Sequence, residues 1–255
     1  MFRWFFTVAA VSLVFGPAAF AGEGRTPTRH WNGCYVGGFA GAALGNDVRA
    51  TEPVSQGGTF PVGDPYGDFA NPFGYHMQLS AIGGGTVGCN YQAAGSPFVL
   101  GVEGELGALR MKGSILDPNG PPDTATSTKS GDWYGVVAGR LGVLSGNTLV
   151  YGKAGVAFLD TESTVLDTCT VAPCGPATLN ATGSARSASL ALGGGIEYAL
   201  SGHWSLKGEY LFIDRDGYDV CGAGGGAGAG SNYCATHDLD GVHTVKFGIN
   251  YKFGQ

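Results

Sequence analysis

The chain has 255 residues, of which 47 are glycine, 44% are hydrophobic and only 13% are charged. A charged share well below the usual figure of about 25% argues against an ordinary soluble domain, and the abundance of hydrophobic and aromatic residues argues against a disordered chain. The formal net charge of −6 makes a surface for nucleic acid or another polyanion a poor expectation, so we expect no nucleic acid partner.

The first 21 residues have the three parts of a secretory signal. Arg3 supplies the positive charge, residues 4–15 are apolar, and Ala19, Phe20 and Ala21 form an A-x-A cleavage site. The apolar stretch is too short for a membrane-spanning helix, which needs about 20 residues. The sequence predicts a cleaved signal peptide over 1–21, a short periplasmic segment over 22–32 and one main domain over 33–255.

The main domain contains segments in which apolar and less apolar residues alternate with the period of a β-strand. In 98–109, Phe98, Leu100 and Leu106 share one face, while Glu103 and Glu105 share the other. Eight segments have this character, and 34–45 and 79–92 among them are rich in glycine: 34–45, 79–92, 98–109, 133–144, 148–159, 187–200, 203–213 and 243–253. Aromatic residues gather near the segment ends, as they do at the two interfaces of a membrane barrel.

The connections between these segments alternate in length. Short ones fall near 93–97, 145–147 and 201–203, and long ones fall at about 46–77, 111–131, 161–185 and 215–241. Short periplasmic turns and long external loops are typical of outer-membrane barrels. The sequence therefore predicts an all-β fold: a closed, antiparallel, eight-stranded transmembrane β-barrel in outer-membrane lipids, with four long external loops.

Charged residues recur on the less apolar face, which is the inner face of such a barrel. A narrow eight-stranded barrel has room only for its own side chains, and a buried charge is costly unless it is paired. We therefore expect a charge network that fills the lumen, with Glu103 facing Arg140 and Glu197 facing Lys207. An ion pathway is the alternative. The network joins four acidic and four basic residues: Glu103, Glu105, Glu197, Glu209, Arg140, Lys153, Lys207 and Lys246.

The six cysteines suit an oxidising compartment. Cys169 lies close to Cys174, and Cys221 lies close to Cys234 on either side of a glycine tract, so local disulfides are the simplest arrangement. Cys34 and Cys89 are a further candidate pair, near the periplasmic ends of adjacent strands. For the two local pairs, disulfides are favoured over a metal site because the five histidines do not cluster along the chain.

Catalytic and cofactor-binding patterns are weak. The five histidines are scattered, and no G-x-S-x-G nucleophile motif occurs. The glycine run at 224–230 lacks the lysine and hydroxyl residue of a phosphate-binding loop. Paired carboxylates such as Glu103 and Glu105 can perform acid–base chemistry, but the four matching cations favour a structural role. We expect no enzyme activity, no cofactor and no metal.

Several stretches resemble the opacity-like outer-membrane surface-antigen family, whose members are eight-stranded barrels. The most specific are "GVEGELG", "WSLKGEYLFID" and "HTVKFGINYKF", and the resemblance touches every predicted strand from Trp31 to Phe253. It implies a structural or surface-antigen role, with porin or adhesin activity in some members and no catalysis. Members commonly end on an aromatic residue, whereas Gly254 and Gln255 follow Phe253 here.

The resemblance also implies an assembly signal in the last strand, read by the barrel-assembly machinery. Lys246, Gly248, Tyr251 and Phe253 occupy its positions in order. Together these observations favour a structural, surface-exposed barrel that contributes to envelope integrity. The alternatives are a small porin for ions or solutes and an adhesin or ligand binder that acts through its loops, with a host or extracellular ligand that the sequence does not identify.

Overall fold

The computed structural model describes residues 31–45, 47–51, 72–116, 118, 123–168, 170, 177–200, 202–226 and 232–253. The predicted signal peptide and residues 22–30 lie outside these ranges, as do Cys169 and Cys174. Every regular element in the described ranges is a β-strand. None of their residues forms a helix of the length and hydropathy needed to cross a membrane.

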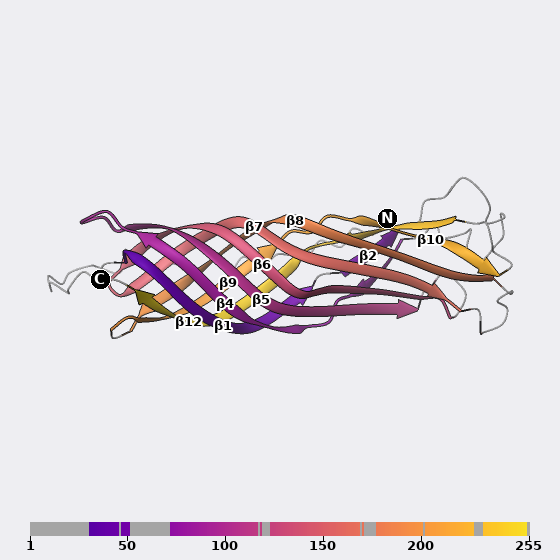
Figure 1. Cartoon of the computed structure of the whole chain (residues 1–255), viewed down its shortest axis with the longest axis horizontal. Coiled ribbons are helices and arrows are strands. Elements are labelled where there is room, and N and C mark those ends of the chain that lie inside the picture. Colours follow the sequence, from indigo (N-terminus) through magenta and orange to yellow (C-terminus); the bar gives the residue numbers. More distant parts are fainter. Residues whose placement is uncertain are drawn as a thin grey trace, which may run out of the picture.

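The described residues form twelve strands: β1 (Gly33–Gly45), β2 (Asp47–Thr51), β3 (Phe73–His76), β4 (Ser80–Tyr91), β5 (Phe98–Leu116), β6 (Ala125–Ser145), β7 (Thr148–Asp167), β8 (Ala177–Ala199), β9 (Trp204–Ile213), β10 (Tyr218–Gly226), β11 (Asn232–Leu239) and β12 (Val242–Phe253). Eight of them close into a ring in the order β1-β4-β5-β6-β7-β8-β9-β12, and β12 returns to β1. The predicted closed, antiparallel, eight-stranded barrel is confirmed (Figure 1).

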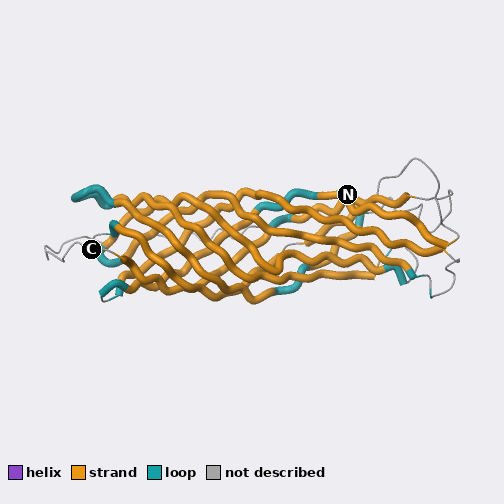
Figure 2. The backbone as a smooth tube through the Cα atoms, in the orientation of Figure 1, coloured by secondary structure: helices purple, strands orange, loops and turns teal. Residues whose placement is uncertain are grey.

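The barrel continues past this ring on the external side. Strands β5 to β8 run on, and β10, β11, β2 and β3 pair beside them in that order after β8. The amide of Gln78, just after β3, donates to the carbonyl of Lys112 in β5 over 2.8 Å, which links the two sides of the extension. In Figure 1, β2 and β10 lie beyond the ring strands β1, β4, β9 and β12, and Figure 2 shows strand along most of the length.

Described parts of all four predicted long loops form strand, namely β2 and β3, the outer ends of β5 and β6, the outer ends of β7 and β8, and β10 and β11. This corrects the sequence-based strand boundaries. Alternation does not stop at the end of the membrane band, but the outward residues change from apolar to polar. On β5, Leu109 and Met111 are buried, whereas Arg110 and Lys112 point outward and are exposed. Polar outward residues do not suit lipid, so the predicted transmembrane strands end at this change although the strands themselves continue.

At the opposite, periplasmic end the strands are joined by tight turns, as predicted. Gly95 and Gly146 hold φ angles of +75° and +60° there. L-residues with a side chain rarely adopt such angles, so glycine suits both turns. The short turns leave little freedom for strand register, which fixes the side chains that face the lumen.

In the part of the chain that the structure describes, two disulfides tie neighbouring strands together. Cys34 bonds Cys89 between β1 and β4, and Cys221 bonds Cys234 between β10 and β11. Each pair is directly opposite in the strand register. One bond therefore lies near the periplasmic rim of the ring and the other lies in the external extension.

Candidate functional site

The structure brings all eight charged residues of the predicted lumen network into one buried layer. Each is at most 5% exposed. They point inward because side chains alternate between the two faces of a strand, and six ring strands contribute: Glu103 and Glu105 from β5, Arg140 from β6, Lys153 from β7, Glu197 from β8, Lys207 and Glu209 from β9, and Lys246 from β12.

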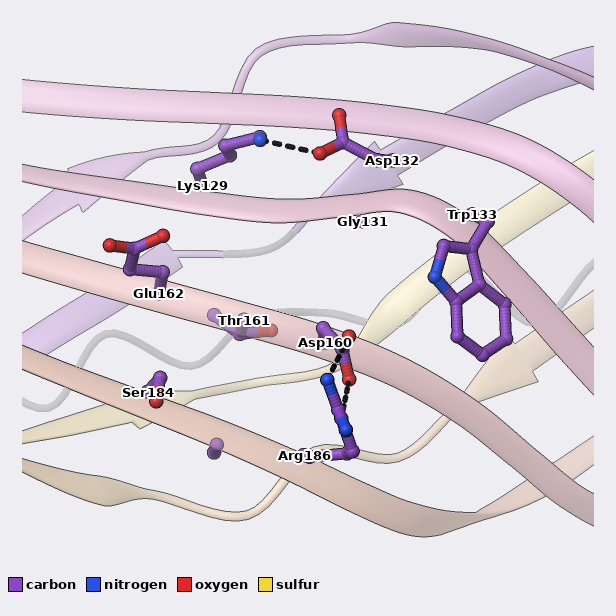
Figure 3. A pocket seen from close by; sticks show the side chains of 10 residues that line it. Lys129, Gly131, Asp132, Trp133, Asp160, Thr161, Glu162, Ser184 and Arg186 are labelled. Atoms are coloured by element: carbon purple, nitrogen blue, oxygen red, sulfur yellow. Dashed lines mark hydrogen bonds and ion pairs between the residues drawn. The ribbon is translucent and has the colours of Figure 1, made fainter.

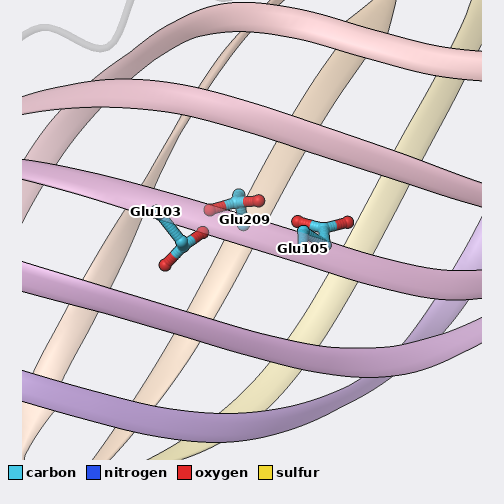
Figure 4. A group of neighbouring side chains, drawn as sticks. All are labelled: Glu103, Glu105 and Glu209. Carbon is cyan, nitrogen blue, oxygen red and sulfur yellow. The ribbon is translucent and has the colours of Figure 1, made fainter.

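Three carboxylates converge at the centre of this layer. Oxygens of Glu103, Glu105 and Glu209 lie within 4.8 Å of one another (Figure 4), a spacing that could hold a cation. The ammonium of Lys153 contacts all three, at 2.6, 3.2 and 3.1 Å respectively. Lys246 contacts Glu105 at 2.6 Å and Glu209 at 2.9 Å. The lysines therefore supply the positive charge that these carboxylates need.

Arg140 extends the network towards the periplasm. Its guanidinium lies 3.3 Å from Glu103 and 2.7 Å from Glu197. Lys207 lies directly opposite Glu197 in the strand register, but its contacts are with Glu103 at 3.1 Å and Glu209 at 3.9 Å. Among the described ion pairs none joins Glu197 to Lys207, because these long side chains reach across the narrow lumen instead of pairing beside their own strands.

Tyrosines complete the network, and the sequence analysis did not single them out. The hydroxyl of Tyr35 donates to Glu103 over 2.6 Å, that of Tyr151 donates to Glu209 over 2.8 Å, and that of Tyr134 donates to Glu105. Charge-assisted hydrogen bonds of this kind are stronger than neutral ones. The alternation of side chains along a strand could have revealed two of these tyrosines. Tyr134 lies an even number of residues from Arg140 and so shares the inner face of β6, and Tyr151 likewise shares the inner face of β7 with Lys153.

Apolar side chains close the lumen on both sides of the charged layer. The periplasmic cluster comprises Trp31, Val99, Leu149, Tyr151 and Ala199. The external cluster is larger and includes Phe39, Ile82, Leu109, Met111, Leu211 and Ile213. The barrel interior is thus packed with its own side chains at three successive levels, as expected for a narrow eight-stranded barrel.

This architecture agrees with what the chain is similar to. Residues 6–253 match the family model described as the outer membrane protein beta-barrel domain. The chain belongs to that family. A 31 kDa outer-membrane immunogenic protein of Brucella melitensis is 29% identical over 84% of this chain and 95% of its own, and Brucella suis has one with the same figures. This outer membrane beta-barrel protein is therefore located in the cell outer membrane.

Two solved structures share distant similarity with this family member. OprG from Pseudomonas aeruginosa aligns with a TM-score of 0.49 and 14% identity, over 88% of this chain and 98% of its own. Ail, the attachment invasion locus protein of Yersinia pestis, aligns with a TM-score of 0.39 and 14% identity, over 87% of this chain and 99% of its own.

The residues of the predicted assembly signal lie on both faces of β12. Lys246 and Gly248 are on the lumen side, and Lys246 belongs to the charge network. The rings of Tyr251 and Phe253 pack edge to face with their centroids 5.3 Å apart, and the rings of Tyr251 and Trp204 do so with centroids 5.0 Å apart. This aromatic group suits the periplasmic interface of a barrel. Recognition by the assembly machinery stays a prediction.

Proposed function

We propose that this outer-membrane barrel is a structural component of the envelope that neither conducts ions nor catalyses a reaction. The observation that carries the proposal is the filled lumen. A layer of four acidic and four basic side chains is closed by apolar clusters on its periplasmic and external sides. Such packing stabilises a barrel and leaves the membrane boundary intact.

The ion-pathway alternative would require the charged layer to exchange its partners for water. The single carboxylate of Glu103, for example, contacts Arg140, Lys153 and Lys207 and accepts a hydrogen bond from Tyr35. A buried charge that loses its partner raises the free energy of the folded barrel by several kcal/mol. The contacts of Glu103 therefore favour a fixed network over a conducting path.

Acid–base catalysis has similarly little support. A general acid or base needs a proton-transfer partner on a substrate within hydrogen-bond reach. Glu103, Glu105 and Glu209 are buried and engaged by lysines and tyrosines. A non-catalytic role is consistent with these contacts.

Planar-bilayer recording of the purified full chain tests the non-conducting part of the proposal. We expect no lasting ion current above that of the empty bilayer. In cells, deletion of the gene should raise detergent sensitivity and leave solute uptake unchanged, and a plasmid copy should restore resistance. A steady ohmic current, or a loss of solute uptake without detergent sensitivity, would show a porin instead. Restoration that requires the external β10–β11 hairpin would favour a binder.

A further inference from the structure

The wall of the barrel is interrupted where β6 leaves the membrane band. Ser130 of β6 pairs with Thr161 of β7 and Tyr134 pairs with Leu159, so Gly131, Asp132 and Trp133 stand opposite the single residue Asp160. This is a β-bulge, a feature that re-aims side chains and is common at barrel rims. Gly131 has a φ of +86°, and a Cβ there would lie 2.1 Å from the carbonyl oxygen of Leu109. Glycine is therefore required at this position.

The bulge opens a groove on the outer face of the wall. Its volume is about 410 Å³, within the range of about 300–1,000 Å³ that is usual for small-molecule sites. In Figure 3, Trp133 stands at one end and Lys129, Glu162 and Ser184 stand at the other, with Asp160 and Arg186 beside the tryptophan. Three strands, β6, β7 and β8, supply the lining.

The charges in and beside the groove balance. Asp132 contacts Lys129 at 2.6 Å and Arg110 at 2.7 Å, and Asp160 contacts Arg186 at 3.0 Å. Glu162, opposite Lys129 in the register, brings the carboxylates to three, which equals the number of cations. A phosphate would meet the carboxylates, and an amine would meet the cations. Neither class of charged ligand is favoured by the site as a whole.

The remaining chemistry suits a sugar. Trp133 is 51% exposed, and its indole offers a flat apolar face on which the C–H face of a pyranose ring can pack. Each sugar hydroxyl is both a donor and an acceptor. It can therefore bond to a carboxylate such as Glu162 and to a donor such as Lys129, and carboxylate oxygens retain free acceptor positions when they are ion-paired.

The position of the groove indicates how such a ligand is presented. On the periplasmic side of the groove the outward residues of β7 and β8 are apolar, for example Phe158 and Leu190. On its external side they are polar, for example Glu162 and Ser184. The groove therefore straddles the boundary between lipid and water, and it opens sideways into the membrane plane. We propose that it binds the uncharged sugar headgroup of a glycolipid in the outer leaflet.

Reconstitution tests this directly. The full chain is incorporated into phosphatidylcholine vesicles with and without diglucosyl diacylglycerol, and retained glycolipid is measured by native mass spectrometry. Trp133→Leu, which keeps an apolar side chain facing lipid, should weaken retention about tenfold, and Glu162→Gln should also reduce it. Trp204→Leu, at the periplasmic rim, is the matched control and should leave it unchanged. Heat-modifiable migration verifies that each variant is folded.

Two further arms separate the sources of the ligand. Binding of an uncharged headgroup should be insensitive to salt, whereas binding of an anion weakens as salt screens the charges. Free maltose should compete only weakly, because it lacks the lipid anchor. Equal retention in wild type and Trp133→Leu would refute the site. Groove-dependent, salt-sensitive retention of phosphatidylglycerol, or maltose binding as tight as that of the glycolipid, would refute the assignment to an uncharged glycolipid.

Discussion

The membrane half and the external half of this barrel use the same strand alternation with opposite polarity. In the membrane half, residues such as Leu100, Val102 and Leu106 face lipid, while Glu103 and Lys153 are buried inside. In the external half, Arg110 and Lys112 face outward, while Leu109 and Met111 are buried. One continuous strand, β5, passes through both arrangements.

The difference shows what each solvent requires. Lipid accepts only apolar side chains, so the polar groups of the membrane half must be satisfied inside the barrel. Water accepts charge, so the external half can bury an apolar core as a soluble protein does. Several of its hydroxyls bond to one another, for example Tyr75 to Thr128 and Ser163 to Tyr218. The membrane half depends on ion pairing and the external half on apolar packing.

The largest effect should follow the loss of a lumen cation. Lys153→Met removes the partner of three buried carboxylates, and breaking such a pair costs about 3–5 kcal/mol. The midpoint of unfolding in detergent and urea should fall accordingly. The matched change Lys129→Met removes an exposed ion pair with Asp132, which is worth about 0–1 kcal/mol. Similar shifts of the unfolding midpoint in the two variants would contradict the claim that ion pairing stabilises the membrane half in particular.

The external half should respond instead to the loss of apolar packing. Met111→Ala leaves a cavity in the external cluster, and such changes cost about 2–5 kcal/mol. We expect faster amide hydrogen exchange in β2, β3, β10 and β11 with little change in the ring strands. Lys112→Ala, on the outward face of the same strand, is the control and should have no such effect. Uniform acceleration throughout the barrel would mean that the halves are one cooperative unit.

Acid should also act on the external half selectively. His237 is fully buried, and burial lowers its pKa to about 4. Because the unfolded imidazole binds a proton more readily than the folded one, stability is fully present above pH 6.5 and is lost as the pH falls from 6.5 towards 4, by about 3 kcal/mol in all. Exchange in β11 should accelerate over this window, and His237→Leu should abolish the change. Equal acid sensitivity in His237→Leu would assign the effect to other groups.

The smallest effect should come from an outward glycine. A Cβ on Gly152 would have no atom within 4 Å, whereas one on Gly155 would lie 2.1 Å from the carbonyl oxygen of Val137. Gly152→Ala should change the free energy of unfolding by no more than about 0.5 kcal/mol, as is usual for surface changes. Gly155→Ala, three residues along the same strand, should be clearly destabilising. A large loss in Gly152→Ala would show that lipid-facing glycines also carry a packing constraint.

The eight strands of the ring could be predicted from the sequence because residues that face lipid must be apolar, which produces a regular alternation with the inward residues. The strands of the external half were missed because their outward residues, such as Lys112 and Thr164, resemble those of loops. Strand parity also identified the charged residues of the lumen. Of the two predicted pairs, Glu103–Arg140 is present at 3.3 Å. The predicted partner of Glu197 was wrong, because Arg140 of β6 reaches past β7 to contact Glu197 at 2.7 Å in place of Lys207. The bulge at Gly131 had no sequence signal beyond the glycine itself.

The reversal of polarity along β5 can be measured directly with spin labels. A single cysteine is introduced at Leu106, Met111 or Lys112, since the described native cysteines are in disulfides, and collisions with oxygen and with a water-soluble paramagnetic reagent are compared in vesicles. A label at position 106 should collide with oxygen, one at 112 with the water-soluble reagent, and one at 111 with neither. Collision of the label at 112 with oxygen alone, or of the label at 111 with the water-soluble reagent, would contradict the account.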